Sequence, residues 1–239
     1  MAKATPFTRV KLKKMFSAIA RDIRTAHFHF RLHCDLRNST KAFRREMNQT
    51  SVFWNLTMDA HLYAAQIALA RAYDKAPNGL NLKMLLQRLY DSKSKSWRSN
   101  AGGYKRPTKR EFEKDKLSVT WWPKVPSRGL RARRNKVVQK LVWNRNKLFA
   151  HFEWDVAVSG RLPKRYRMTY GEYEKLLDRA RALLNKYGNV FLGTSYSVQM
   201  AGTDDYTRVL KAQRVALRGE RKKLADEYKS LRKVRAKRE

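Results

Sequence analysis

The sequence predicts an all-α protein. In several long segments, apolar residues recur at steps of three and four, which is the spacing of one face of a helix. Glycine and proline residues fall between these segments, where they mark turns. With 42% hydrophobic and 11% aromatic residues, the chain has enough apolar material for a folded core. We therefore expect a helical bundle that carries a long basic insertion loop and ends in a basic C-terminal helix.

The first three expected helices cover residues 11–37, 51–73 and 80–89. In the first, apolar residues and arginines lie mostly on opposite faces. The second is apolar nearly all round, with a stripe on each of two faces. These stripes are Phe53, Leu56, Ala60, Tyr63, Ile67 and Ala70, and Trp54, Met58, Ala65 and Leu69. Because a helix with two apolar faces is buried by neighbours on both sides, we expect residues 51–73 to form the central helix.

Two more helices are expected in the second half of the chain. Apolar residues recur at helical steps over residues 130–151. Thr169 and Glu172 have the S/T-x-x-E spacing of a capping box, which opens a helix that we expect to stop at Gly188. Residues 189–202 mix β-branched, aromatic and glycine residues, a composition that allows an extended segment.

A last helix is expected to begin at residues 203–205 and to run to the C-terminus, with 13 basic and 4 acidic residues after position 207. Its apolar residues are mostly about seven apart, a spacing typical of coiled pairing. In a simpler interpretation, its first half docks on the domain and its second half is a solvated basic tail. We divide the chain into a helical domain over residues 1–200, which includes the basic loop, and a basic helical extension over residues 201–239.

The charge balance is the strongest signal in the composition. The chain has 55 lysine and arginine residues against 20 aspartate and glutamate residues, a formal net charge of +35. A polyanion would offset the self-repulsion of such a charge, so RNA or DNA is the leading partner and an anionic membrane surface the second. No apolar run approaches the roughly 20 residues of a membrane-spanning helix, and we expect no membrane insertion.

We expect the protein in the cytoplasm. The N-terminal segment MAKATPFTRVKLKK lacks the apolar core of a secretory signal, although its basic, acid-poor composition keeps an organelle transit peptide open. The single cysteine, Cys34, excludes an internal disulfide and suits a reducing compartment.

Residues 92–136 lack helical periodicity over most of their length and carry 15 lysine and arginine residues against 3 acids. We expect a long basic loop there, with one short helix near residues 108–116. Its aromatic residues, Trp97, Tyr104, Trp121 and Trp122, are interleaved with lysines and arginines, the mixture that stacks bases and holds phosphates. The RNA-binding candidates are Lys105, Arg106, Lys109, Arg110, Trp121, Trp122, Arg128, Arg131, Arg133 and Arg134. The alternative is a solvated insertion whose tryptophans cap the core.

An arginine and a histidine lie six residues apart in the segment NRNKLFAHFEWD, residues 144–155. This pattern resembles the signature of the HEPN superfamily, in which a polar residue follows the arginine and a histidine comes four to six residues after it. The form R-N-K-x-x-A-H, with acidic and aromatic residues after it, is most similar to the AbiU-like, abortive-infection branch. The segments SVFWN, ALARAYD and NLKMLLQRL agree with that branch in order and placement, so that the resemblance covers about residues 10–200.

The resemblance implies an all-α HEPN fold and a metal-independent endoribonuclease with no cofactor, whose catalytic residues are Arg145, Asn146 and His151. It also implies a homodimer and a role in a prokaryotic phage-defence or toxin–antitoxin system, where a cognate antitoxin would be a further partner. The chemistry is consistent, because RNA supplies its own 2′-OH nucleophile. His151, with an unperturbed pKa near 6.5, can transfer a proton at neutral pH. Arg145 offers a planar set of donors to the phosphate, and Asn146 can orient the phosphate or the imidazole.

Helix geometry sets one condition on this site. Six positions place Arg145 and His151 about 120° apart on a straight helix, so that a single helix does not assemble the site. The family's arrangement is a dimer with facing motif helices, which would bring two arginines and two histidines into one cleft. The alternative is a helix that ends near Phe149 and lets His151 turn back.

Other interpretations of the motif stay open. A non-catalytic nucleic-acid-binding module would use the same basic surface, and a structural role would pair the motif with Glu153 or Asp155. In a further interpretation, the chain is the toxic half of a pair that a cognate nucleotidyltransferase silences. Some HEPN toxins are silenced at a tyrosine two residues past the histidine, where this chain has Glu153.

The segment AHFHFRLHCD gathers three histidines and a cysteine. His29 and His33 are four residues apart, a spacing compatible with two metal ligands. The four candidate ligands point in three directions, however, and one helix cannot close a tetrahedral site, so we expect packing and surface contacts instead. His61 is expected to be a satisfied core histidine. No Walker loop, dinucleotide fingerprint, or serine or cysteine nucleophile signature occurs.

Overall fold

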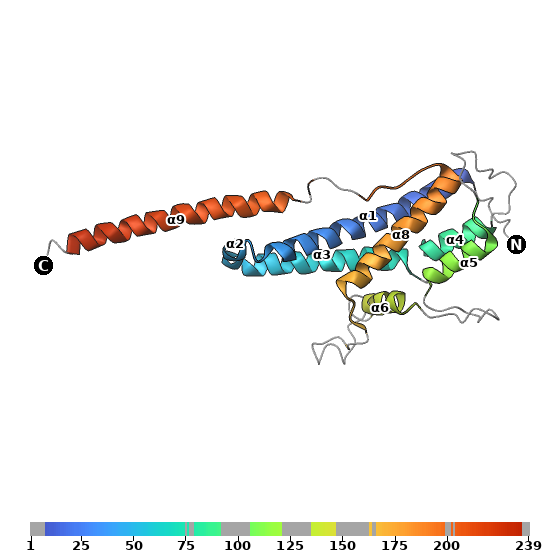
Figure 1. Cartoon of the computed structure of the whole chain (residues 1–239), viewed down its shortest axis with the longest axis horizontal. Helices are drawn as coiled ribbons and strands as arrows, with labels where there is room; N and C mark the ends of the chain where they lie inside the picture. Colours follow the sequence, from blue (N-terminus) through green and yellow to red (C-terminus); the bar gives the residue numbers. More distant parts are fainter. Residues whose placement is uncertain are drawn as a thin grey trace. The chain divides into compact units, whose positions relative to one another are not determined.

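The computed structural model describes residues 8–74, 76, 79–91, 106–120, 135–146, 163, 166–198, 202 and 204–235. These residues form eight helices and no strand, which confirms the predicted all-α class. The helices are α1 (Arg9–Ser39), α2 (Arg44–Gln49), α3 (Ser51–Ala72), α4 (Leu82–Asp91), α5 (Lys109–Ser118), α6 (Lys136–Asn144), α8 (Tyr170–Leu192) and α9 (Asp205–Arg235) (Figure 1). None of these helices has the length and apolar content needed to span a bilayer.

The chain forms two compact units. Unit 1 comprises Met1–His29 and Tyr63–Gln199, and unit 2 comprises Phe30–Leu62 and Met200–Glu239. Unit 1 therefore holds the beginning of α1, the end of α3, and helices α4, α5, α6 and α8. Unit 2 holds the remaining parts of α1 and α3 together with α2 and α9. The division into a domain of residues 1–200 and an extension of residues 201–239 stays a prediction.

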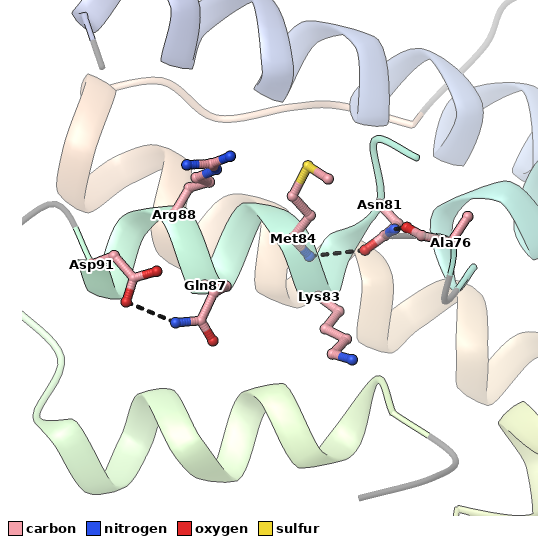
Figure 2. Close-up of a pocket in the computed structure, with 7 residues that line it drawn as sticks. All are labelled: Ala76, Asn81, Lys83, Met84, Gln87, Arg88 and Asp91. Carbon is pink, nitrogen blue, oxygen red and sulfur yellow. Dashed lines mark hydrogen bonds between the residues drawn. The ribbon is translucent and has the colours of Figure 1, made fainter. Parts of the chain in front are cut away.

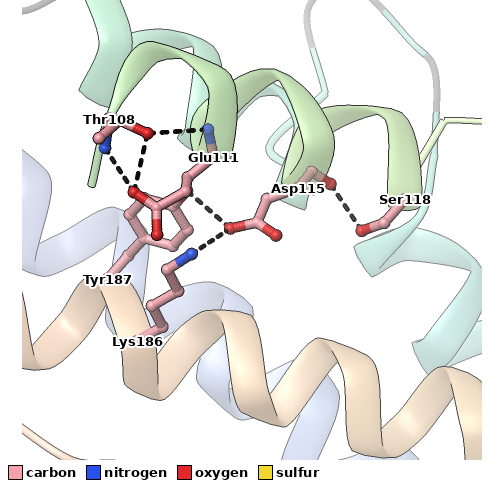
Figure 3. Close-up of polar contacts among 6 residues, drawn as sticks. All are labelled: Thr108, Glu111, Asp115, Ser118, Lys186 and Tyr187. Atoms are coloured by element: carbon pink, nitrogen blue, oxygen red, sulfur yellow. Dashed lines mark hydrogen bonds and ion pairs between the residues drawn. The ribbon is translucent and has the colours of Figure 1, made fainter. Parts of the chain in front are cut away.

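In unit 1, the short helix expected inside the basic loop is present as α5, and it is part of the core. Thr108 caps its first turn in a capping box, and the Phe112 side chain is only 5% exposed. Asp115 accepts hydrogen bonds from Lys186 Nζ at 2.7 Å and from the Tyr187 hydroxyl at 2.9 Å, both on α8 (Figure 3). These contacts hold α5 against α8, so the chain is anchored midway through the segment predicted as a loop.

The expected end of α8 is wrong. The helix continues through Gly188 to Leu192, and Gly193 ends it with a left-handed φ of 65°. Gly188 has a different function, because a Cβ there would lie 2.7 Å from the Thr194 carbonyl oxygen. The missing side chain thus lets the chain after the helix lie directly against it. Residues 189–192 are helical and residues 193–198 have no regular structure, so the extended segment is not observed.

The burial predicted for α3 is also wrong over most of one of its two stripes, in which only Ala70 is buried. Trp54 and Leu69 are buried, at 6% and 1% exposure, as expected. On the other stripe, Phe53 is 59% exposed and Leu56 is 64% exposed, and Tyr63 is 48% exposed. An apolar pattern shows where a helix can be buried, but burial also needs an element of the chain to lie on that face. In the part of the chain that is described, no element covers this stripe from Phe53 to Ile67.

Unit 2 has its own small core, which confirms the simpler interpretation of the C-terminal helix. Leu36, Met47, Trp54 and Leu210 form one buried cluster, in which Leu210 comes from the second turn of α9. The Tyr206 hydroxyl lies 3.0 Å from Ser39 Oγ and adds a polar contact at the start of the same helix. Residues 218–233 are exposed throughout. The first turns of α9 therefore dock, whereas residues 218–233 are solvated and mostly basic or polar.

Candidate functional site

Helix α6 ends directly before the arginine of the motif, and it is fixed in unit 1 at its start and along its length. Asn135 caps its first turn by accepting from the Val138 amide at 3.2 Å, and its Nδ2 donates to the Ser118 carbonyl at the end of α5. Farther along α6, Lys140 Nζ donates to Glu172 Oε1 on α8 at 2.6 Å. Burial alone raises the pKa of Glu172, but the hydrogen bonds from Lys140 and from the Thr169 backbone outweigh it and leave this pKa lowered.

The Arg145 side chain follows α6 and is held on two sides. Its Nη1 lies 2.8 Å from Asp74 Oδ2, just past the end of α3, and its Nε donates to Asn146 Oδ1 at 3.0 Å. Both partners of the ion pair are largely shielded, with the Arg145 side chain 26% and the Asp74 side chain 18% exposed. These contacts use two of the five N–H donors of the guanidinium. The other three have no protein acceptor in the part of the chain that is described.

A buried polar cluster lies in the same region of unit 1. Asn144, the residue before Arg145, is 3% exposed, Gln66 on α3 is 8% exposed, and Tyr173 on α8 is 4% exposed. Burial raises the pKa of the Tyr173 hydroxyl, while its hydrogen bonds with Asn144 and Gln66 act in the opposite direction. Asn144 Oδ1 and Gln66 Oε1 have no hydrogen-bond partner among the described residues. The cluster therefore links three helices through polar groups whose burial is costly.

Of the predicted catalytic residues, Arg145 and Asn146 lie together, joined by the hydrogen bond between them. His151 lies outside the described residues. The residues Asp74, Asn144, Gln66 and Tyr173 were not among those predicted from the sequence. A signal for two of them was present, because Asp74 ends the ALARAYD segment and Asn144 directly precedes the motif.

The predicted RNA-binding residues are described only in part. Arg106, Lys109 and Arg110 are exposed at the start of α5, and the Arg106 guanidinium lies 5.9 Å from the centre of the Phe191 ring. Arg106 also lines a cavity of about 480 Å³ beside α8, together with Lys186. The other candidates lie outside the described residues: Lys105, Trp121, Trp122, Arg128, Arg131, Arg133 and Arg134.

A smaller cavity of about 240 Å³ lies along α4 (Figure 2). Gln87 Nε2 donates to Asp91 Oδ1 at 2.7 Å, and Asn81 Oδ1 accepts from the Met84 amide at 2.8 Å. Two of the polar side chains that line it, Gln87 and Asn81, are thus held by hydrogen bonds to other residues of the lining.

The histidine-rich segment of α1 makes protein contacts. His33 is 4% exposed, and its Nδ1 lies 2.8 Å from the Met58 carbonyl oxygen. Burial, followed by the charge of Arg181, lowers the pKa of His27. His61 is half-buried on α3. Among the described residues, no group of three or more histidine, cysteine, aspartate or glutamate side chains is arranged to hold a metal ion.

An all-α chain that presents an arginine–asparagine pair at the end of a docked helix has the features of a HEPN domain. The chain belongs to the AbiU2 family of HEPN proteins, whose family model matches residues 9–211. The resemblance to the AbiU-like branch and the HEPN-like helical fold are thus both confirmed. No curated protein and no solved structure matches the chain.

Proposed function

We propose that this protein is a metal-independent endoribonuclease of a prokaryotic phage-defence or toxin-like system. In this proposal, Arg145, Asn146 and His151 form the catalytic site. The observation that carries it is the fixed arginine: Asp74 and Asn146 hold the Arg145 guanidinium at two of its nitrogens, and among the described residues its other donors have no acceptor. An arginine positioned before substrate binds can stabilise a phosphorane without reorganising during the reaction.

The reaction needs two proton transfers and one stabilised anion. The 2′-oxygen attacks the neighbouring phosphorus and loses its proton to a neutral imidazole, the bond from phosphorus to the 5′-oxygen breaks, and a protonated imidazole supplies the proton to that leaving oxygen. The products are a 2′,3′-cyclic phosphate and a 5′-hydroxyl. Arg145 would bind the non-bridging oxygens. Asn146 Oδ1 already accepts from Arg145, so its Nδ2 is the group left to orient the phosphate.

A homodimer completes the site in this proposal. Two copies of His151 would supply the base and the acid that the two proton transfers need, and a facing copy would resolve the offset of about 120° that six positions on a straight helix would give. The partners would be RNA, which the net charge of +35 favours, and a cognate antitoxin in the cytoplasm. Glu153 stands where a modified tyrosine silences some HEPN toxins, so we do not assign that form of control.

The test is cleavage of a 5′-labelled RNA by the purified full chain in excess EDTA. We expect products that end in a 2′,3′-cyclic phosphate and no cleavage of the matching 2′-deoxy strand, because DNA lacks the nucleophile. His151→Ala and Arg145→Ala should each lower the rate by roughly 100-fold or more while RNA binding persists. Equal cleavage by wild type and His151→Ala preparations would reject the site.

The second candidate function is a non-catalytic nucleic-acid-binding HEPN module, which the net charge favours without any reference to the motif. The same assay separates the two. A wild-type protein that binds RNA tightly and leaves it intact, with or without divalent metal, would establish the binding module instead.

A further inference from the structure

Unit 2 contains a basic groove between α2 and α9, with a volume of about 520 Å³. Cations stand on both of its sides. Those from the α2 side are Lys41, Arg44 and Arg45, and those from α9 are Arg214, Arg218 and Arg221. The sequence predicts only the basic character of the C-terminal helix, because the residues of the two sides are separated by about 170 positions in the chain.

One of these arginines, Arg214, connects the two sides of the groove. Arg214 Nε donates to Glu46 Oε1 at 2.5 Å and Nη2 donates to the Ala42 carbonyl, while the guanidinium lies 4.4 Å from the centre of the Phe43 ring. Gln213 adds a hydrogen bond from Nε2 to the Glu46 carbonyl at 2.9 Å. The hydrogen bond from Arg214 is the main cause of the lowered pKa of Glu46, whose side chain is 5% exposed. These contacts join α9 to α2, and the ion pair with Arg214 neutralises the charge of Glu46.

The other five cations of the groove are exposed, and in the described part of the chain none of them has a carboxylate within 4 Å. Against them the groove holds one further carboxylate, Glu220. Like charges that line one groove destabilise one another, and a polyanion offsets this repulsion. Four of the five are arginines, whose planar guanidinium binds phosphate through two hydrogen bonds and stacks on bases.

We propose that the α2–α9 groove binds the phosphate backbone of an RNA strand. Cations on both sides of a concave surface suit a strand that lies between them, whereas a membrane offers its charges in a plane. Binding in the groove requires neither Arg145 nor cleavage, so this proposal and the nuclease are tested separately. The groove gives unit 2, which contains none of the catalytic residues, a function in holding RNA.

The test uses the full chain and a fluorescein-labelled 20-mer of 2′-O-methyluridine, whose blocked 2′-oxygen prevents cleavage. The groove variant is Arg45→Gln, Arg218→Gln and Arg221→Gln. The matched control is Lys222→Gln, Lys223→Gln and Lys233→Gln, which removes the same charge from exposed positions of α9 that do not line the groove.

Each lost phosphate contact on a single strand lowers the slope of log K against log salt by about 0.7, which corresponds to roughly fourfold in affinity at 0.15 M salt. The groove variant should therefore bind about 50-fold more weakly, with a slope smaller by about two. The control should stay within about threefold of wild type. Equal weakening in both variants would overturn the proposal, since the effect would then be general charge. Binding to vesicles of phosphatidylcholine and phosphatidylserine, but not to the oligonucleotide, would overturn it in favour of a membrane surface.

A second measurement does not depend on the variants being folded. Wild-type protein irradiated with a 4-thiouridine-containing 20-mer should cross-link at peptides that contain residues 41–49 or 214–224. Cross-links confined to other parts of the chain would overturn the assignment of the groove.

Discussion

Replacing Asp74 tests whether the ion pair to Arg145 positions the catalytic arginine. The two side chains are 2.8 Å apart, and their exposures of 26% and 18% lie between those of a surface pair and a buried pair. Surface pairs contribute about 0–1 kcal/mol and breaking a buried pair costs about 3–5 kcal/mol, so Asp74→Ala should lower the free energy of unfolding by about 1–2 kcal/mol.

The effect on cleavage should be larger than the effect on stability suggests. A hydrogen bond to a charged group is worth about 1.5–3 kcal/mol, which corresponds to roughly 10- to 150-fold in kcat/KM if the arginine loses its orientation. Asp74→Asn should fall between wild type and Asp74→Ala, because its amide oxygen still accepts a hydrogen bond. The assay is the initial rate of cleavage of a fluorophore–quencher RNA, with urea unfolding measured in parallel.

Asp22 provides a matched control in the same unit, because it accepts from Arg71 Nη2 at 2.8 Å. In that pair the Arg71 side chain is 54% exposed, so Asp22→Ala should cost less than about 1 kcal/mol and leave the cleavage rate unchanged. Wild-type kinetics in Asp74→Ala, or an equal loss in both variants, would refute the positioning of Arg145. Faster cleavage in Asp74→Ala would show instead that this carboxylate competes with the phosphate.

Three further predictions concern stability. Gly188→Ala should lower the free energy of unfolding by about 1–3 kcal/mol, because its Cβ would lie 2.7 Å from a backbone oxygen. The control Gly219→Ala, whose Cβ would have nothing within 4 Å, should be neutral or stabilising. Equal thermal midpoints for the two variants would contradict the close contact at Gly188. Glu172→Gln should destabilise the protein at neutral pH. Because folding lowers the pKa of Glu172, the difference in unfolding free energy between wild type and Glu172→Gln should persist at pH values above the usual pKa of 4.5. In urea titrations, the difference should vanish as the pH falls below 4.5. A difference that stays constant with pH would contradict the ion pair with Lys140. Thr108→Ala should cost about 1 kcal/mol through the lost cap of α5, whereas Thr108→Ser should restore most of it in the same melts.

Local sequence signals predicted the helices well where the signal was itself local. The capping box at Thr169 and Glu172 set the start of α8, and the periodicity of residues 11–37 predicted α1 to within two residues at each end. The end of α8 was missed because glycine serves two purposes. Gly193 ends the helix with a positive φ, whereas Gly188 sits inside it to admit the returning chain, and only the packing distinguishes the two.

The candidate site was predicted only as far as the motif extends. Residues 145 and 146 stand out in the sequence, but the carboxylate that holds Arg145 comes from a position 71 residues earlier. The exposed stripe of α3, with Phe53 and Leu56, shows the same limit in the other direction. Apolar periodicity indicates which face of a helix can be covered, but not whether any part of the chain covers it.

The helical class and the family follow from the order of the amino acids, because helix periodicity, capping and the family motif are properties of neighbouring residues. The excess of positive charge follows from composition alone. The pairing of Arg145 with Asp74 and the groove between α2 and α9 were decided by the packing of whole helices. Contacts between distant segments depend on how the side chains of several helices pack together, and no short stretch of sequence contains that information.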